Sequence, residues 1–361
     1  MNKRTKHLHE LGQSLWLDNI TRDILDNGTL RRYVDEYSIT GLTSNPTIFD
    51  HAIAETSAYD STISEKANRG QGGEDLFLEL ALEDLRRAAD LFRPAFDASD
   101  GVDGWASMEV SPLLAADTTG SIEAAARVYR QANRPNIFVK IPGTPEGIPA
   151  IEESIFAGVP INVTLLFSRE QYFAAANAYL RGIERRLAAG LDPKVASVAS
   201  LFVSRWDKAI EPRVPAGLRN RLGIAIAQRT YCAYRELMAS PRWRKLSGLG
   251  ARVQRLLWAS TGTKDPKAPD TLYVESLAAP DTINTMPAET LRAFAEHGHL
   301  RGVMAVDGGD AEVVLARFAS SGIDVDTLAH QLQRDGAQAF VKSWKELLGR
   351  IADKSSSLVR G

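Results

Sequence analysis

The chain has 361 residues, with 43 basic and 45 acidic side chains and a formal net charge of −2. This near balance argues against nucleic acid as a partner, because nucleic-acid-binding domains usually carry a basic excess. The sequence contains no stretch of 18 uncharged apolar residues, so no membrane span is predicted. The charged amino-terminal segment lacks the apolar core of a signal peptide. The one cysteine, Cys232, suits a reducing compartment, so we expect a cytoplasmic protein.

Short apolar runs alternate along the chain with longer amphipathic segments. The short runs are predicted to be strands: Ser14–Asn19, Ser38–Thr43, Trp105–Val110, Asn136–Ile141, Ile161–Leu166, Val195–Val203, Arg255–Ser260 and Thr271–Ser276. Segments with apolar residues near a period of 3.6 are predicted to be helices: Glu74–Phe92, Ile122–Ala132, Arg169–Ala188, Ala216–Met238, Ala288–Glu296, Asp310–Ser320 and Thr327–Ala352. The polar tail that begins at Lys354 is expected to be a frayed terminus.

Apolar strands interleaved with helices predict an α/β protein, and eight such strands predict a closed (β/α)8 TIM barrel with additional helices. Strands this apolar are typical of a parallel sheet that is covered on both faces. We expect one domain over residues 1–361, with barrel strands within about 14–276 and carboxyl-terminal helices within about 288–352. Two extra stretches, Asp50–Gly73 and Pro212–Gly250, have no predicted role beyond packing.

Polar side chains recur near the ends of six predicted strands, which is where barrel enzymes build their sites. The polar residues are Asp18, Thr43, Asn45, Glu109, Lys140, Asn162, Thr164, Ser200 and Arg205, and the aromatic Phe202 shares a strand face with Ser200. Residues i and i+2 of a strand share a face, so the pairs with this spacing could line the barrel interior. A single polar residue at a strand end is commonplace and is usually structural. The same feature on six strands favours a functional site.

Lys140 interrupts the apolar run Ile137–Ile141, and lysine is seldom fully buried without a partner. An amine among apolar walls is destabilised in its charged form, and the neutral amine can attack a ketone to give a Schiff base. Cleavage of a neighbouring carbon–carbon bond also needs a carboxylate, and Asp18 and Glu109 are available. Thr164 could hold a water between them. The alternative is a structural lysine paired with one of these carboxylates.

Five motifs on five predicted strands together resemble the transaldolase family. They are LTSNPTIF (Leu42–Phe49), SMEVSP (Ser107–Pro112), NIFVKIPGT (Asn136–Thr144), GVPINVTLLFS (Gly158–Ser168) and VASLFVSRWD (Val198–Asp207). The resemblance covers about Leu15–Pro287, and the WASTGTKDP stretch (Trp258–Pro266) resembles the longer bacterial form. It implies a class I aldolase-type barrel without cofactor or metal, because Schiff-base chemistry needs none.

The resemblance also implies a reaction in the pentose phosphate pathway. A three-carbon dihydroxyacetone unit would pass from sedoheptulose 7-phosphate or fructose 6-phosphate to glyceraldehyde 3-phosphate or erythrose 4-phosphate. By motif, Lys140 would form the Schiff base, Asp18 would act as general acid and base, and Glu109 with Thr164 would order the catalytic water. The implied substrate contacts are Thr43, Asn45, Asn162, Ser200, Phe202 and the phosphate-binding Arg205.

One segment departs from the family pattern. Many members carry a second phosphate-binding arginine after the seventh strand, in an Ala-Ser-Phe-Arg pattern, whereas this sequence reads Ala-Ser-Thr-Gly-Thr-Lys (Ala259–Lys264). Lys264 could supply the charge, because phosphate accepts lysine as a point charge, and Ser260 or Thr261 could supply a hydroxyl. The alternative for Lys264 is a solvated loop lysine.

Two other functions fit the same inventory. One is a fructose-6-phosphate aldolase-like enzyme that releases free dihydroxyacetone; small relatives of this kind replace the glutamate, so Glu109 favours the transferase. The other is a barrel that binds sugar phosphates without catalysis, which the joint presence of Lys140, Asp18, Glu109 and Thr164 disfavours. We expect small-molecule sugar phosphates as partners, and the oligomeric state is left open between monomer and homodimer.

Overall fold

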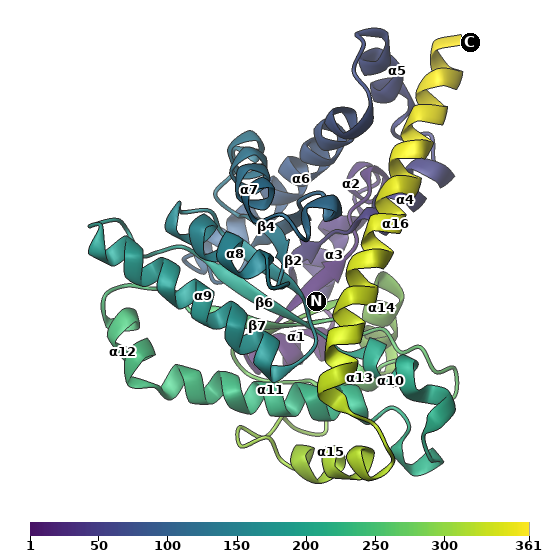
Figure 1. Ribbon diagram of the computed structural model, residues 1–361. Coiled ribbons are helices and arrows are strands. Elements are labelled where there is room, and N and C mark those ends of the chain that lie inside the picture. Colours follow the sequence, from purple (N-terminus) through teal and green to yellow (C-terminus); the bar gives the residue numbers. More distant parts are fainter. Residues whose placement is uncertain (361) are drawn as a thin grey trace.

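Eight parallel strands form a closed barrel in the computed structural model, which describes residues 1–360 (Figure 1). The strands are β1 (Gln13–Asp18), β2 (Ile39–Thr43), β3 (Trp105–Glu109), β4 (Ile137–Pro142), β5 (Ile161–Leu166), β6 (Ser197–Phe202), β7 (Gln254–Ala259) and β8 (Thr282–Met286). Each strand pairs with its neighbours in sequence order, and β8 closes the barrel by pairing with β1 from Gln13–Thr282 to Leu17–Met286. The predicted TIM barrel is therefore confirmed.

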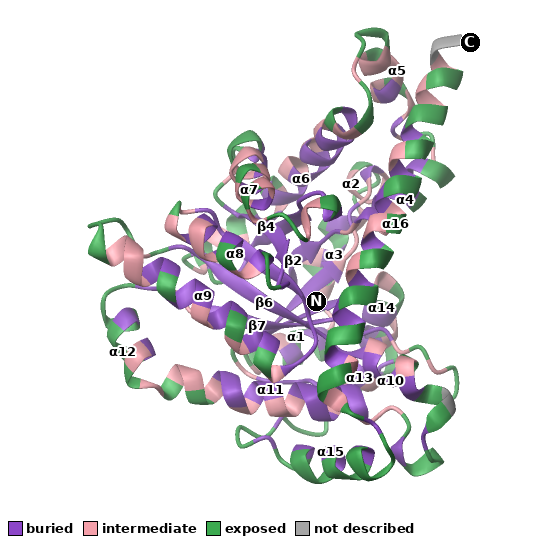
Figure 2. Ribbon diagram, viewed as in Figure 1, coloured by how far each residue is buried: buried purple, intermediate pink, exposed green. Residues whose placement is uncertain are grey.

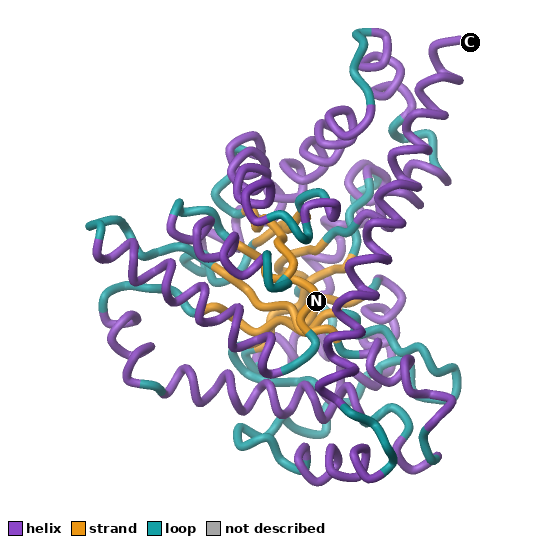
Figure 3. The backbone as a smooth tube through the Cα atoms, viewed as in Figure 1, coloured by secondary structure: helices purple, strands orange, loops and turns teal. Residues whose placement is uncertain are grey.

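Helices surround the barrel on all sides (Figure 3). They are α1 (Lys3–Glu10), α2 (Arg22–Asp26), α3 (Thr29–Tyr37), α4 (Pro46–Glu55), α5 (Asp60–Asn68), α6 (Gly73–Ala98), α7 (Thr118–Ala132), α8 (Gly147–Phe156), α9 (Arg169–Ala188), α10 (Ser204–Ile210), α11 (Leu222–Ala239), α12 (Pro241–Gly248), α13 (Leu272–Ser276), α14 (Ala288–His297), α15 (Ala311–Ser320) and α16 (Val325–Arg360). Short 3-10 turns are η1 (Pro112–Leu114), η2 (Glu211–Arg213) and η3 (Ala216–Leu218). The strands are buried, and the exposed residues lie on the outer helix faces and loops (Figure 2).

The prediction of the eighth strand was wrong. Thr271–Ser276 was expected to be that strand, but most of it forms helix α13, whose Tyr273 packs inward and donates a hydrogen bond to Asp207 (2.8 Å). The true strand β8 follows it, so the barrel strands end at residue 286 and not near 276. Its polar side chains are bonded inside the fold: Thr282, for example, donates to the carbonyl of Ala279 (2.6 Å).

One predicted helix agrees with the structure at both ends, and others differ. Arg169–Ala188 matches α9, which Ser168 caps by accepting the amide of Gln171 (3.2 Å). Ala216–Met238 divides into the 3-10 turn η3 and helix α11. The tail from Lys354 is not frayed: it continues α16, and Lys354 donates to the carbonyl of Thr56 (2.7 Å). The predicted extra stretch Asp50–Gly73 supplies the end of α4 and all of α5, the surface on which this tail docks.

The barrel interior is divided between aromatic and polar side chains. Trp105 stacks on Phe138 with ring centroids 4.0 Å apart, and Trp16 lies 6.0 Å from Phe138. Asp18 and Lys140 lie two residues further along the same strands and therefore share the interior face. The aromatic side chains thus form the floor below the polar mouth. Helix α16, the long yellow helix of Figure 1, contacts α4, α5, η1 and β5 on the carboxyl-terminal side of the barrel.

None of the described helices combines the length and the apolar character that a membrane span requires.

Candidate active site

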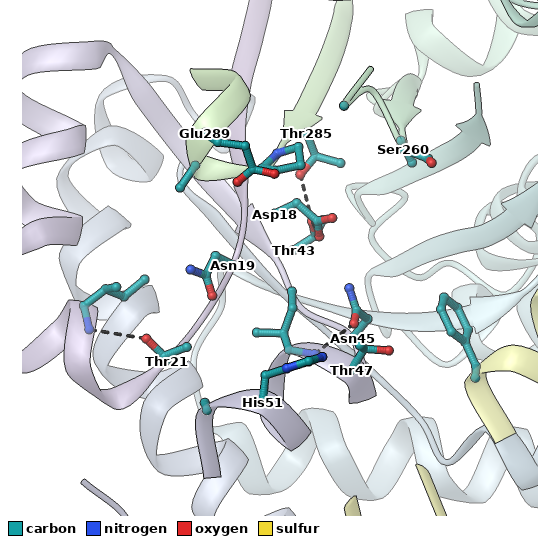
Figure 4. Close-up of a pocket in the computed structure, with 18 of the residues that line it drawn as sticks. Asp18, Asn19, Thr21, Thr43, Asn45, Thr47, His51, Ser260, Thr285 and Glu289 are labelled. Carbon is teal, nitrogen blue, oxygen red and sulfur yellow. Dashed lines mark hydrogen bonds between the residues drawn. The ribbon is translucent and has the colours of Figure 1, made fainter. Parts of the chain in front are cut away.

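A cavity of about 670 Å³ opens at the carboxyl-terminal ends of the strands, and part of it is shown in Figure 4. The predicted site residues in its wall are Asp18, Thr43, Asn45, Lys140, Thr164, Ser200, Phe202, Arg205, Ser260 and Lys264. The two others, Glu109 and Asn162, are buried directly behind this wall, in contact with Lys140 and Ser200 respectively. The structure therefore brings all the residues predicted for the site together at one end of the barrel, as expected for this fold.

The amine of Lys140 lies at the bottom of this cavity. Lys140 is 6% exposed; its Nζ donates to the backbone carbonyl of Ser44 (2.9 Å) and lies 3.2 Å from Oε1 of Glu109. The ion pair considered for this lysine from the sequence is thus present. It does not remove the lysine from the cavity, because Lys140 lines the same space as Asp18. The arrangement offers an amine with a proton acceptor beside it.

Two carboxylates flank the lysine, and both are withdrawn from bulk water. Burial raises the pKa of Asp18 above its usual value, although Lys140 and a hydrogen bond from Thr43 (2.8 Å) oppose the shift. Burial likewise raises the pKa of Glu109, again against the charge of Lys140. Carboxyl groups whose pKa is raised in a cavity are suited to proton transfer near neutral pH.

A small second cavity of about 10 Å³ lies behind the lysine and is lined by Glu109, Lys140, Thr164 and Phe340, among others. Oε2 of Glu109 and Oγ1 of Thr164 are buried and have no hydrogen-bond partner among the described residues. A buried polar atom without a partner is unfavourable by about 1–3 kcal/mol. Both residues line the small cavity, which has about the volume that one water molecule needs.

A chain of polar side chains crosses the barrel from β3 to β6. Nδ2 of Asn162 donates to the hydroxyl of Ser107 (3.1 Å), and Ser200 donates to Oδ1 of Asn162 (2.7 Å). Asn45 caps helix α4, because its side-chain oxygen accepts the amide of Ile48 (3.1 Å). These bonds fix the orientation of hydroxyl and amide groups in the cavity wall.

Arg205 places a positive charge in the wall of the cavity. The guanidinium of Arg205 lies 4.8 Å from the ring centre of Phe202 and 5.7 Å from that of Phe340. Burial lowers the pKa of Arg205, and the nearby carboxylates of Glu109 and Asp18 oppose this shift. A guanidinium held between two rings is well placed to bind an anion with defined geometry.

Lys264 and Ser260 also line the cavity. Nζ of Lys264 lies 3.6 Å from the position that a Cβ atom would occupy at Gly262. Ser260 has φ +57° and shares a hydrogen bond with Ser204 (2.8 Å), at the start of the helix that carries Arg205. A side chain at position 262 would therefore begin within van der Waals contact of the lysine ammonium.

Residues of two elements were missed by the sequence analysis. Thr285 of β8 shares a hydrogen bond with Thr43 (2.7 Å) and thereby supports the bond from Thr43 to Asp18. It was missed because β8 was misplaced; correct placement and alternation would have identified it. Phe340 of α16 lines both cavities, and no local sequence signal predicts that this helix reaches the barrel mouth.

No metal centre accompanies these groups in the part of the chain that the structure describes. Within residues 1–360, no three or more histidine, cysteine, aspartate or glutamate side chains are grouped so that they could hold a metal ion.

Comparisons with known proteins place the site in a family context. Residues 15–351 match the family model described as transaldolase/fructose-6-phosphate aldolase. The chain is 42% identical to a transaldolase of Thermobifida fusca over 98% of this chain and 99% of that relative. It is 43% identical to a transaldolase of an Arthrobacter species over 97% of both chains, and 40% identical to transaldolase 2 of Nostoc punctiforme over 97% of this chain and 98% of the relative.

Proposed function

The chain belongs to the transaldolase/fructose-6-phosphate aldolase family, and we propose that it is a transaldolase that works through a Schiff base on Lys140. The reaction is the reversible transfer of a dihydroxyacetone unit from a ketose phosphate to an aldose phosphate. The observation that carries the proposal is the cavity in which the amine of Lys140 lies beside two carboxyl groups, with the cationic side chains of Arg205 and Lys264 in its wall. The cytoplasmic location expected from the single cysteine is part of the proposal.

Imine formation begins at Lys140. Its amine must lose a proton to become a nucleophile, and Oε1 of Glu109, 3.2 Å away, is the nearby acceptor. Attack on the ketone carbonyl gives a carbinolamine, which loses water to become an iminium ion. A water bonded to Oε2 of Glu109 and Oγ1 of Thr164 would pass protons in this step and in the later hydrolysis; the proposal is supported by the lack of any other hydrogen-bond partner for these two buried atoms among the described residues.

Carbon–carbon cleavage follows on the iminium. Asp18 takes the proton of the hydroxyl at C4, the C3–C4 bond breaks, and its electron pair moves into the iminium to give an enamine. The raised pKa of Asp18 makes this carboxyl a stronger base than an exposed one, and the bond from Thr43 fixes its direction. The aldose phosphate then leaves, and the enamine attacks the aldehyde carbon of the acceptor by the reverse sequence.

Substrate binding divides between two groups of residues. We assign the hydroxyl groups of the donor to Thr43, Asn45, Asn162 and Ser200, whose side chains are held in fixed orientations by hydrogen bonds. We assign the phosphate to the cationic side chains of Arg205 and Lys264, with Phe202 and Ser260. Gly262 stands where the Ala-Ser-Phe-Arg pattern of other family members has its arginine. The ammonium of Lys264 lies close to this position, which supports the assignment of Lys264 as the substitute for that arginine.

The deciding experiment is a transfer assay with fructose 6-phosphate as donor, with and without erythrose 4-phosphate. We expect rapid consumption of the ketose only when the acceptor is present, because the enamine keeps the three-carbon unit on Lys140 until an aldehyde arrives. Acceptor-independent release of free dihydroxyacetone would instead identify an aldolase. No consumption under either condition would contradict an enzymatic function.

The Schiff base is tested separately on Lys140. We expect borohydride added with fructose 6-phosphate to reduce the imine and leave a stable adduct on this residue, which peptide mass spectrometry locates. Lys140→Ala should remain folded and lose turnover by at least ~10³-fold, because covalent catalysis is lost. An unmodified Lys140 peptide, or a variant with activity near that of the wild type, would exclude this mechanism.

A further inference from the structure

One face of helix α16 lies against the two parts of the site that carry Thr164 and Arg205. The contacts are made by Gln333, Gly336 and Phe340, which are spaced i, i+3 and i+7 and therefore share a face of the helix. Each of the three is buried, although α16 is otherwise an outer helix. This face, defined by the three residues, is the mouth-facing side of α16.

Gln333 links the ends of two barrel strands. Its Nε2 donates one hydrogen bond to the carbonyl of Gly143 (2.9 Å) and another to the carbonyl of Leu165 (3.0 Å). Gly143 directly follows β4, which carries Lys140, and Leu165 directly follows Thr164 in β5. Buried backbone carbonyls need hydrogen-bond partners, so this single amide satisfies one carbonyl at the end of each strand.

The backbone at Leu165 is unusual. Leu165 has φ +58°, in the left-handed region, and the β5–β6 register shifts between Val163 and Leu166. A bulge of this kind re-aims a neighbouring side chain, and a non-glycine residue keeps this conformation only where its surroundings hold it. The carbonyl that Gln333 holds belongs to this residue. The direction of Thr164 thus depends on a bulge that α16 stabilises.

Gly336 allows α16 to lie close to Arg205. A Cβ atom at this position would stand 2.9 Å from Cδ2 of Leu165 and 3.0 Å from Nη1 of Arg205, both closer than an ordinary contact. Glycine inside a helix is unfavourable compared with alanine, so a close approach is the physical benefit that offsets it here. One turn further on, the ring of Phe340 covers the same guanidinium at 5.7 Å.

We propose that the mouth-facing side of α16 positions the site: Gln333 sets the direction of Thr164, and Gly336 with Phe340 sets the place of Arg205. These are positioning residues, since they act through Thr164 and Arg205 and not on the substrate. The inference rests on the transaldolase reaction proposed above and adds that residues of the carboxyl-terminal helix determine its rate and its affinity for phosphate.

Gly336→Ala tests the arginine half, with Gly349→Ala as the matched control on the same helix. A Cβ atom at Gly349 meets nothing within 4 Å. Both substitutions favour the helix, so neither should lower the melting temperature by its effect on propensity. We expect Gly336→Ala alone to raise the KM for fructose 6-phosphate about tenfold, the size of effect expected for a weakened hydrogen bond to a charged group. An equal KM in the two variants would overturn this half.

A double-mutant comparison separates positioning from general damage. If Gly336 acts through Arg205, Gly336→Ala should add no further change in KM to an Arg205→Ala enzyme, because the group it displaces is already gone. Effects that multiply would show that Gly336 acts elsewhere and would overturn its role as a positioning residue for Arg205.

Gln333→Ala and Gln333→Glu test the threonine half. We expect Gln333→Ala to lower kcat by ~10- to 100-fold with little change in KM, since a misdirected Thr164 slows imine formation and hydrolysis. In Gln333→Glu an ionised carboxylate would face two carbonyl oxygens, whereas the protonated form can donate to one of them. The activity of this variant relative to the wild type should therefore rise as the pH falls. A ratio independent of pH, or an unchanged kcat in Gln333→Ala, would overturn this half.

The wild-type enzyme, assayed in parallel, separates this inference from the function on which it rests. No acceptor-dependent transfer by the wild type would overturn both. Transfer by the wild type, together with Gln333 and Gly336 variants that behave as Gly349→Ala does, would overturn the inference alone. If Gln333→Ala proves too unstable to assay, the pH dependence of Gln333→Glu decides the threonine half, and the comparison of Gly336→Ala with Gly349→Ala decides the arginine half.

Discussion

The two carboxyl groups beside Lys140 favour proton transfer but lower the stability of the folded protein. Burial raises the pKa of both Asp18 and Glu109, which means that ionisation of either group is less favourable in the folded protein than in the unfolded chain. The nearby lysine reduces this penalty without abolishing it. The free energy that ionisation of these carboxyl groups costs must therefore be offset by other interactions in the fold, as is common in active sites.

The substitution Asp18→Asn separates the effect of this carboxyl group on turnover from its effect on stability. Turnover should fall by at least ~10²-fold, because the general base is lost. The free energy of unfolding should rise relative to the wild type at neutral pH. The reason is that a folded-state pKa above the unfolded value makes the wild type lose stability as the pH rises between the two pKa values, and the amide does not titrate.

The measurement is urea unfolding of both proteins at neutral pH and at a pH below the ordinary aspartate value of 3.8. The stability advantage of Asp18→Asn should be present at neutral pH and vanish in acid, where the wild-type carboxyl is protonated in both states. An advantage that grows on acidification, or a variant less stable at neutral pH, would contradict the assignment of a raised pKa to Asp18.

At the scale of elements, alternation along the strands predicted the site well and the eighth strand poorly. In β4 and β5, i and i+2 residues share the interior face; Lys140 and Thr164 line the cavity, and Asn162 lies directly behind its wall in contact with Ser200. Thr271–Ser276 has the apolar, β-branched and aromatic composition of a strand, but short buried runs of this kind do not distinguish strand from helix. The true β8, Thr282–Met286, has a polar sequence and so does not resemble a buried strand. The residues that satisfy its polar side chains, such as Gln13 and Thr43, lie far away in the sequence.

The length of α16 was equally hidden from local patterns. Its terminal serines and lysine have a weak apolar periodicity and resemble a solvated tail. The helix is held by contacts with α4 and α5 instead: Arg350 pairs with Asp50 (2.6 Å) and Lys354 with the carbonyl of Thr56 (2.7 Å). Such partners, about 300 positions away, are not visible in any local window.

Trp344 should be the main anchor of this half of α16. It is 3% exposed and packs edge-to-face on Phe77 with ring centroids 5.0 Å apart, and Phe77 packs on Phe49 in the same way at 5.2 Å. We expect Trp344→Ala to lower the free energy of unfolding by about 3–5 kcal/mol, through lost burial and the cavity left behind. Lys345→Ala, at the exposed neighbouring position, is the control and should change it by less than about 0.5 kcal/mol. Urea unfolding that gives equal values for the two variants would show that α16 does not unfold with the barrel.

The whole molecule combines one barrel interior with two kinds of packing. Below the cavity, Trp16, Trp105 and Phe138 fill the barrel from three strands, whereas above them the same strands present polar groups. The interleaved pattern of strands and helices was sufficient to predict the barrel, because eight βα units close in this way. This pattern could not predict which interior positions require a small residue, since the space at each position depends on side chains that meet across the barrel.

Gly41 is the interior position where this dependence is strongest. A Cβ atom there would stand 2.6 Å from Cε2 and Nε1 of Trp16 and 2.7 Å from the backbone oxygen of Trp105. The indole is fully buried, and the carbonyl belongs to the backbone of the adjacent strand, so neither can move without shifting the barrel. Glycine is required here because a side chain has no space. Backbone conformation is not the reason, since the φ of Gly41 does not lie in the left-handed region.

Gly41→Ala should therefore destabilise the protein by about 1–3 kcal/mol, although alanine is not disfavoured in strands compared with glycine. The same displacement should lower kcat, because Trp16 lies two residues from Asp18 on β1 and moves the floor of the cavity. Gly217→Ala is the matched control, since a Cβ atom there meets nothing within 4 Å. Urea unfolding and the transfer assay should show both losses in Gly41→Ala and neither in the control. A Gly41→Ala protein of normal stability would mean that the aromatic floor yields to an added methyl group and does not fix the position of Asp18.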